Sequence, residues 1–280
     1  KKIPYASEHA VTFADESMEM VSYYAIKSSS DLAAERGAYS SYKGSLWSKG
    51  ILPLDSVELL KKERGEEFIE VDTTTRLDWE GLKKIVKKQG MRNSNVMAIA
   101  PTATIANITG LTQSIEPTYS NLFVKSNLSG EFTIINMHLV DALKEIGMWD
   151  EVMVYDLKNL NGSLEGINRV PEELKKLFAT SFEVEPKWLI EAASRRQKWI
   201  DQSQSLNLYV SEPNGKKLDV MYKMAWLRGL KTTYYLRSRS ATTSEKSTIT
   251  NLELNAVAAN QGSEAPEACS ILDPDCEACQ

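Results

Sequence analysis

The chain alternates between helical and extended patterns of apolar residues. From His9 to Arg36, apolar residues recur at steps of three and four positions and Gly37 follows, which predicts a long amphipathic helix that ends at this glycine. The same periodicity, with capping residues at the ends, predicts shorter helices over 57–64, 78–89, 136–146, 172–179, 188–199 and 218–228. Much of the chain is therefore expected to be helical.

Short apolar runs between these helices predict strands. The run Val96–Ala100 is apolar throughout and ends at Pro101, as in a strand that is buried on both faces of a parallel sheet. Further strands are predicted over 122–125, 132–135, 205–210 and 232–236. Because strands and helices alternate, we expect an α/β fold.

Length and charge narrow the class of protein. A chain of 280 residues with 42% hydrophobic content can build one or two domains with a substantial core. The net charge of -5 comes from interleaved acids and bases, so no basic face is available for nucleic acid. No run approaches the roughly 18 to 20 apolar residues of a membrane span, and we expect a cytoplasmic protein with no membrane contact. The first residue is Lys, so we expect processing or excision from a longer chain.

The composition changes near Arg239. Residues 240–280 are rich in Ser, Thr, Asn, Gln, Glu, Ala and Gly, with only scattered apolar side chains. Such a segment buries too little apolar surface to offset the entropy of ordering. We therefore predict a folded body over 1–239 and a flexible tail over 240–280.

All three cysteines lie in this predicted tail. Cys276 and Cys279 form a C-x-x-C pair that can close and open a disulfide by thiol exchange, whereas Cys269 has no redox spacing. A coil of about 40 residues has a reach of roughly 35 Å, so a mobile dithiol could carry electrons to a distant pocket. The alternatives are a stray exposed pair or half of a zinc site. With only His9 and His138 available, no metal site is expected in this chain.

Small and hydroxyl-bearing residues follow the apolar run at 96–100. Pro101, Thr102, Ala103, Thr104 and Ile105 lie where a strand gives way to a helix, and unpaired N–H groups beside small side chains suit a phosphate there. The alternative is a threonine-rich turn that is capped by its own hydroxyl. The segment lacks the glycines and the lysine of a Walker loop, so a nucleoside triphosphatase is not indicated.

A pair of tyrosines, Tyr234 and Tyr235, falls in the predicted strand 232–236. In a regular strand the two rings face opposite sides of the sheet, which usually means one core ring and one surface ring. If the strand is irregular here, the two phenols could instead stack and pass an electron and a proton between them. The sequence leaves both possibilities open.

Several motifs, in their order along the chain, resemble the large subunit of class I ribonucleotide reductases. The similarity runs across nearly all of residues 1–280. The motifs are Arg92-Asn93-Ser94, Pro101-Thr102-Ala103-Thr104, Ser114-Ile115-Glu116-Pro117, Leu128-Ser129-Gly130-Glu131-Phe132, Ile200-Asp201-Gln202-Ser203-Gln204-Ser205-Leu206-Asn207, Gly229-Leu230-Lys231-Thr232, Tyr234-Tyr235-Leu236-Arg237 and the terminal cysteine pair.

The resemblance implies a fold and a chemistry. The fold is a ten-stranded α/β barrel of two antiparallel five-stranded halves, of which this chain would supply mainly the second. The chemistry is reduction of ribonucleoside diphosphates at the 2' carbon by a thiyl radical, which a metal-containing small subunit generates across the subunit interface. Site roles follow from the same matches: residues 101–105 would bind the substrate diphosphate and Tyr234 and Tyr235 would form the radical relay. Cys276 and Cys279 would re-reduce the active-site disulfide and be reduced in turn by thioredoxin or glutaredoxin.

The sequence also departs from this family. The Asn-x-Cys-x-Glu finger loop with the radical cysteine, the two active-site cysteines and the N-terminal region that binds nucleotide effectors are not in these 280 residues. We therefore expect no cofactor on this chain itself, no activity from it alone, and a need for the N-terminal half as a partner. Two other hypotheses, a stand-alone thiol–disulfide oxidoreductase and a non-catalytic module that binds an anion at 101–105, each explain a single motif.

Overall fold

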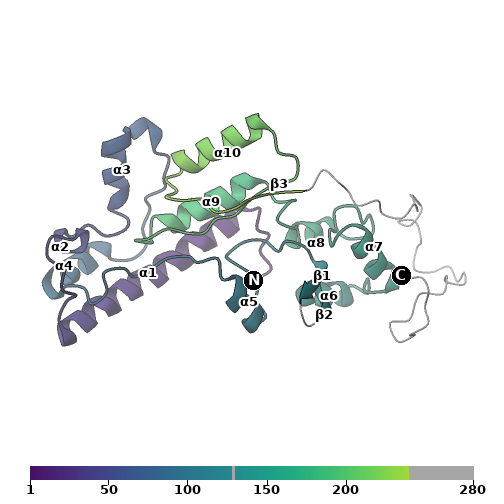
Figure 1. Cartoon of the computed structure of the whole chain (residues 1–280), viewed down its shortest axis with the longest axis horizontal. Coiled ribbons are helices and arrows are strands. Elements are labelled where there is room, and N and C mark those ends of the chain that lie inside the picture. The colour runs from purple at the N-terminus through teal and green to yellow at the C-terminus, as the bar shows by residue number, and fades with distance from the viewer. Residues whose placement is uncertain (128–129, 240–280) are drawn as a thin grey trace, which may run out of the picture.

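A computed structural model describes residues 1–127 and 130–239, and long helices form its framework (Figure 1). Helix α1 (Glu8–Arg36) runs along the molecule, and α4 (Trp79–Gln89) and α9 (Pro186–Gln197) pack against it. Helix α10 (Gly215–Leu227) packs on α9. No helix of the described residues combines the length and the apolar character that a membrane span requires.

Helix boundaries follow the capping residues in the sequence. The hydroxyl of Ser7 accepts a hydrogen bond from Ala10 N at the start of α1, and the helix ends at Gly37 with a φ of 79°. Asp78 caps α4 through Gly81 N, and Gly90 ends this helix with a φ of 86°. These two predicted helices are confirmed almost to the residue.

Shorter elements complete the body. Between α1 and α4 lie α2 (Leu46–Lys49), α3 (Ser56–Arg64) and the 3₁₀ turn Glu66–Phe68, and α5 (Ala103–Thr109) follows the threonine-rich loop. A separate group, around its own buried cluster, contains α6 (Met137–Glu145), α7 (Glu151–Asn159), α8 (Glu172–Leu177) and the antiparallel pair β1 (Leu122–Asn127) and β2 (Gly130–Ile135). The sequence pattern did not predict α7.

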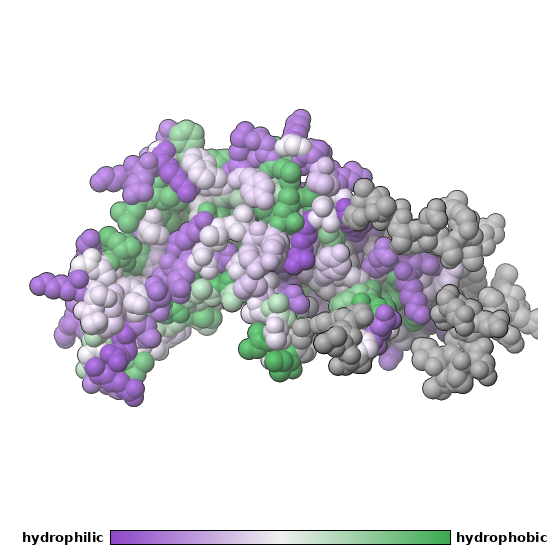
Figure 2. Space-filling model, viewed as in Figure 1, coloured by the Kyte–Doolittle hydropathy of each residue, from purple (hydrophilic) through white to green (hydrophobic). Residues whose placement is uncertain are grey.

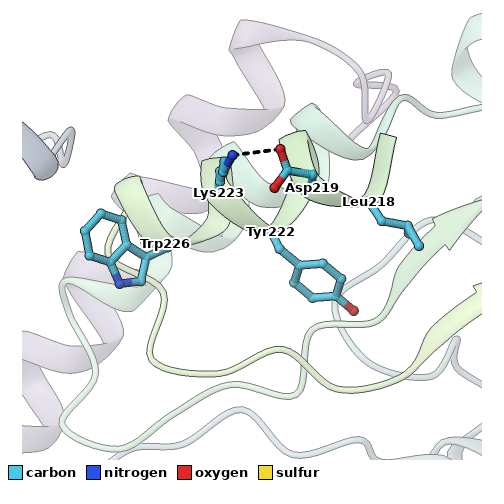
Figure 3. A pocket seen from close by; sticks show the side chains of 5 residues that line it. All are labelled: Leu218, Asp219, Tyr222, Lys223 and Trp226. Carbon is cyan, nitrogen blue, oxygen red and sulfur yellow. Dashed lines mark hydrogen bonds and ion pairs between the residues drawn. The ribbon is translucent and has the colours of Figure 1, made fainter. Parts of the chain in front are cut away.

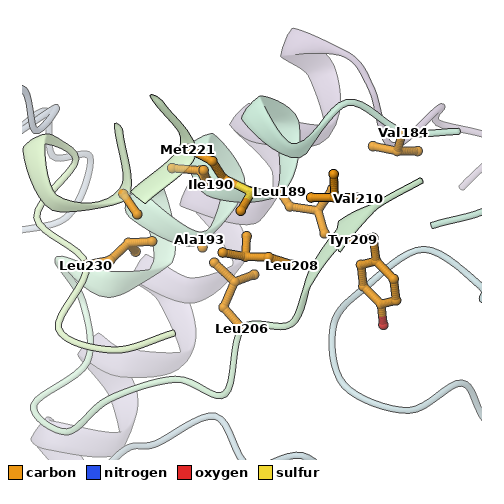
Figure 4. Close-up of a cluster of buried hydrophobic side chains, with 11 residues drawn as sticks. Val184, Leu189, Ile190, Ala193, Leu206, Leu208, Tyr209, Val210, Met221 and Leu230 are labelled. Atoms are coloured by element: carbon orange, nitrogen blue, oxygen red, sulfur yellow. The ribbon is translucent and has the colours of Figure 1, made fainter. Parts of the chain in front are cut away.

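A second small sheet lies beside α9 and α10. Strand β3 (Leu208–Val210) pairs in parallel with β4 (Leu236–Ser238), so that Leu208 lies opposite Leu236. Leu189 and Ile190 of α9, Met221 of α10 and the β3 side chains form a common buried cluster (Figure 4). This packing of helices on one face of parallel strands is the α/β arrangement that the sequence predicts.

The predicted strand at 96–100 is wrong as a regular strand. Only an isolated parallel bridge, between Ile99 and Gln204, is present there. The N–H groups of Val96 and Met97 bind the carboxylate of Asp201, at 2.9 and 2.7 Å, so they are not available to a neighbouring strand. The final strand also begins later than predicted, at Leu236. The described residues hold two two-stranded sheets that do not close into a barrel, and the ten-stranded arrangement stays a prediction.

The buried face of α1 differs from the predicted apolar stripe. Val21 and Leu32, which belong to that stripe, are exposed, whereas the carboxylates of Asp15 and Glu19 are buried. Asp15 accepts hydrogen bonds from Trp199 Nε1 at 2.6 Å and lies 3.1 Å from Lys198 Nζ. A buried acid is tolerated where donors from other segments satisfy it, and local periodicity cannot reveal those donors.

Asp72 extends this buried ionic cluster and gives it a pH dependence. Its carboxylate lies 2.7 Å from Lys198 Nζ and 3.0 Å from Arg195. Burial raises the pKa of Asp72, but the hydrogen bonds from Lys198 and Thr74 and the nearby positive charges outweigh it and lower the pKa from 3.8 to about 2. Because the folded pKa is depressed, the stabilisation is present above pH 4 and is lost as the pH falls toward 2.

We expect Asp72→Asn to lower the free energy of unfolding by roughly 2 kcal/mol at pH 7, since each unit of pKa shift is worth about 1.4 kcal/mol. The loss should shrink as the pH falls from 4 toward 2. Urea unfolding of the chain and of the variant at pH 7, 4 and 3 measures this difference. A difference that stays constant across these pH values would show that the carboxylate charge does not stabilise the fold.

Candidate functional site

Three extended segments meet beside α9. Met97 O accepts a hydrogen bond from Gln202 N, Ser205 N donates to Ile99 O, and Tyr234 N donates to Leu206 O at 2.7 Å. Ile99 lies opposite Gln204, and Leu208 lies opposite Leu236. The segment that leads into the predicted phosphate loop and the segment that carries the predicted tyrosine pair therefore both bind the segment 202–208.

The segment 101–105, in which Pro101 and Thr102 lead into the first turn of α5, has one strained residue and is held by Ser114. Thr102 has a φ of 53°, a left-handed conformation that costs a β-branched residue about 1–3 kcal/mol. Ser114 N donates to the Thr102 hydroxyl at 3.0 Å, and the Ser114 hydroxyl donates to Pro101 O at 3.1 Å. The Thr102 side chain makes no capping bond to its own helix α5. The turn is thus not capped by its own hydroxyl, and that alternative is wrong.

Residues 102–105 are open to solvent. Thr102, Ala103, Thr104 and Ile105 are all exposed, and further along α5 Ile108 is 80% exposed. Figure 2 shows the apolar surface that projects at α5. A ligand would therefore have access to this loop.

Tyr234 and Tyr235 lie together on the surface just before β4. Their ring centroids are 4.2 Å apart with the planes tilted by 50°, and the residues are 44% and 55% exposed. The hydrogen bond with Tyr235 is the main cause of the raised pKa of Tyr234. The expectation of one core ring and one surface ring is wrong, because the backbone is not a regular strand at 234–235 and both phenols lie in contact on the exposed side.

Glu116 connects these two parts of the site, and the motif analysis assigned it no role. Its carboxylate accepts from Asn207 N at 2.8 Å, from Asn207 Nδ2 at 3.1 Å and from the Tyr209 hydroxyl at 2.8 Å. Burial, the charge of Glu116 and this hydrogen bond raise the pKa of Tyr209 far above its usual range. Asn207 Oδ1 in turn accepts from Tyr235 N at 3.3 Å. The sequence signal was the acid in Ser114-Ile115-Glu116-Pro117, but nothing local shows what it binds.

The remaining candidates are the cysteine pair, a metal site and a hollow on α10. Cys276 and Cys279 fall outside the described residues, as do Cys269 and the whole predicted tail. No group of three or more His, Cys, Asp or Glu in residues 1–127 and 130–239 could hold a metal ion. A hollow of about 440 Å³ on α10, where Tyr222 and Trp226 line one side, shares no residue with the loop or the tyrosine pair (Figure 3).

The fold and the site define an α/β domain in which a hydroxyl-rich segment and a phenol pair flank short parallel pairings with the segment 202–210. The sequence model of the family described as "Ribonucleotide reductase, barrel domain" matches residues 1–236. The chain belongs to this family.

Relatives across bacteria and eukaryotes agree with this assignment. The ribonucleoside-diphosphate reductase subunit alpha of Chlamydia trachomatis is 56% identical over 99% of the chain, which covers 28% of that protein. The large subunit from Danio rerio is 41% identical over 85% of the chain and 29% of its own length. The chain thus spans less than a third of these relatives.

A solved structure shares the fold. The Actinobacillus ureae class Id ribonucleotide reductase alpha subunit superposes with a TM-score of 0.62 at 24% sequence identity. The match covers 92% of this chain and 37% of that protein. At this identity the likeness concerns the fold alone.

Proposed function

We propose that the chain acts as the C-terminal part of the large subunit of a ribonucleoside-diphosphate reductase. In this proposal residues 101–105 bind the substrate diphosphate, Tyr234 and Tyr235 relay the radical, and Cys276 and Cys279 deliver reducing electrons. The observation that carries it is the contact of the two exposed phenols, whose ring centroids are 4.2 Å apart. Family membership over residues 1–236 supports the same assignment.

The overall reaction needs groups that these 280 residues do not supply. Reduction at the 2' carbon replaces the hydroxyl by hydrogen, releases water and oxidises a dithiol to a disulfide, so two electrons and two protons come from thiols. The thiyl radical would form on a cysteine of the N-terminal half, and the radical would come from the metal cofactor of the small subunit. The chain would bind no cofactor itself, and nucleotide effectors would act on the N-terminal region.

The local geometry suits the two roles assigned to the described residues. Exposed Thr102 and Thr104 present hydroxyls and backbone N–H groups without a large side chain in front of them, which suits an anionic diphosphate. Two phenols in contact allow a proton to move between oxygens while an electron passes from ring to ring. The exposure of both rings leaves them accessible to a partner subunit.

Complementation tests the proposal. The chain is mixed with the N-terminal part of the Chlamydia trachomatis subunit alpha that it does not cover, a metal-containing small subunit and a dithiol, and conversion of a ribonucleoside diphosphate is followed. We expect deoxynucleotide only in the complete mixture, because each component holds groups that the others lack. Absence of product from a mixture whose assembly is verified by light scattering would contradict the proposal. Insulin reduction by the chain alone would favour a stand-alone thiol–disulfide oxidoreductase.

A further inference from the structure

The groups around Glu116 are hydrogen-bond donors, which suit a carboxylate. The three donors around it are the backbone N–H and the side-chain amide of Asn207 and the hydroxyl of Tyr209. A carboxylate only accepts hydrogen bonds and satisfies all three, whereas a glutamine would turn its own amide donor toward one of them. None of these three donors carries a charge. The acid is therefore held by neutral donors and by geometry.

The next link runs from this acid to the tyrosines. Asn207 is 7% exposed, and both ends of its amide are used: Nδ2 donates to Glu116 and Oδ1 accepts from Tyr235 N. Leu208 N also donates to Tyr235 O at 2.9 Å. The backbone of Tyr235 is thus hydrogen-bonded through both its N–H and its C=O.

The segment 114–116, which contains Glu116, also contacts residues 101 and 102 through Ser114. Ser114 holds Pro101 and Thr102 through two hydrogen bonds, and Glu116 follows two positions later in the chain. Movement of the 114–116 segment would therefore displace the loop and the tyrosine pair together.

We propose that Glu116 and Asn207 are positioning residues, which hold the Tyr234–Tyr235 pair at a set distance from the substrate loop. The inference rests on the proposed function for its consequence in turnover, but the positioning itself is a property of the chain. Within the described residues, Asn207 binds the backbone N–H of Tyr235, and neither residue has a hydrogen bond to the phenol oxygen of Tyr234 or Tyr235. Glu116 and Asn207 set the positions of the two rings. These positions determine how well an electron and a proton pass between the rings.

The positioning is tested without turnover by ¹⁹F NMR of the 280-residue chain that carries 3-fluorotyrosine at position 235. In Asn207→Leu and Glu116→Gln we expect the signal to move toward that of free 3-fluorotyrosine, because the Tyr235 peptide loses its anchor. Glu19→Gln is the control: Glu19 is likewise a buried acid, which accepts from Arg76 N, Leu77 N and Trp79 Nε1 and lies 3.5 Å from the Arg76 guanidinium, but it is on α1 and is bonded to none of Asn207, Tyr209 and Tyr235. A signal that stays in place in Asn207→Leu, or that moves equally in Glu19→Gln, overturns the proposal.

Exchanging donor and acceptor between residues 116 and 207 distinguishes the loss of this one hydrogen bond from a general destabilisation of the fold. Asn207→Asp alone sets two carboxylates against each other. Asn207→Asp with Glu116→Gln restores a donor facing an acceptor and keeps an oxygen for Tyr235 N, while the Tyr209 hydroxyl, which shares the Glu116 oxygen with Asn207 Nδ2, turns to accept from the new amide. We expect the double variant to regain the wild-type ¹⁹F signal that the single variant loses. No recovery in the double variant counts against the proposed pairing.

Kinetics in the complemented enzyme complete the test. We expect Asn207→Leu to lower kcat by about 100-fold and Glu116→Gln by about 10-fold, with KM changed by no more than about 2-fold, as when a small misplacement weakens only the transition state. A rise in KM at constant kcat would place both residues in substrate binding and overturn the positioning role. If the wild-type mixture shows no turnover while the ¹⁹F results hold, the proposed function fails and the positioning stands.

Discussion

Tyr234→Phe and Tyr235→Phe are each expected to lower turnover of the complemented reductase by about 10³-fold or more, with substrate binding unchanged. A phenylalanine keeps the ring but has no O–H, so it cannot give up a proton together with an electron. The rings lie 4.2 Å apart and are largely exposed, so loss of either hydroxyl leaves the core intact. Deoxynucleotide formation and nucleotide affinity are measured on the same preparations.

Tyr222→Phe is the control for this experiment. Tyr222 is a similarly exposed phenol, but it lies on α10 in the hollow shown in Figure 3. Its replacement should leave turnover unchanged. Full activity in either Tyr234→Phe or Tyr235→Phe would remove the radical relay from the proposed function, whatever the result for substrate binding at 101–105.

The second large effect concerns the terminal thiols. We expect Cys276→Ser with Cys279→Ser to reduce thioredoxin-driven turnover to background while much of the turnover with dithiothreitol remains. A small dithiol reaches a buried disulfide directly, whereas a protein reductant needs a thiol pair that carries electrons inward. Assays with the two reductants on one enzyme preparation make the comparison.

Cys269→Ser provides the matched control for the tail. This cysteine lies in the same predicted tail but has no partner at redox spacing, so its replacement should leave both activities intact. Equal loss with both reductants in the Cys276/Cys279 double variant would mean that the pair is needed for structure or chemistry other than electron delivery. Equal retention would identify it as a bystander.

Local signals in the sequence predicted several elements well. Helix α4 was found from Asp78 and Gly90, and α6 from Asn136, because capping uses side chains within a few residues of the helix end. The strands expected at 122–125 and 132–135 are present and extend over 122–127 and 130–135. By contrast, the buried side of α1 was misjudged, because Trp199 and Lys198 satisfy Asp15 from more than a hundred residues away.

The candidate site likewise has parts that local sequence signals predicted and parts that depend on distant residues. The residues at 101–105 and 234–235 were named from their motifs, but the sequence could not choose between a phosphate-binding turn and a self-capped turn, or between separated and adjacent phenols. The structure shows no side-chain cap at Thr102, and phosphate binding there stays a prediction. The irregular backbone before β4 brings the two phenols together. Glu116 had no local signal of its role, since its partners Asn207 and Tyr209 lie on another segment.

The sequence by itself determined which family the chain resembles, where most helices begin and end, and which loop and which tyrosines are candidates. These features depend on order along the chain and on interactions over a few residues. The tertiary structure alone decided that both segments bind the segment 202–208, and that Glu116 binds Asn207, whose amide oxygen accepts from Tyr235 N. Hydrogen bonds between segments about ninety residues apart depend on how strands align, and composition and periodicity carry no record of that alignment.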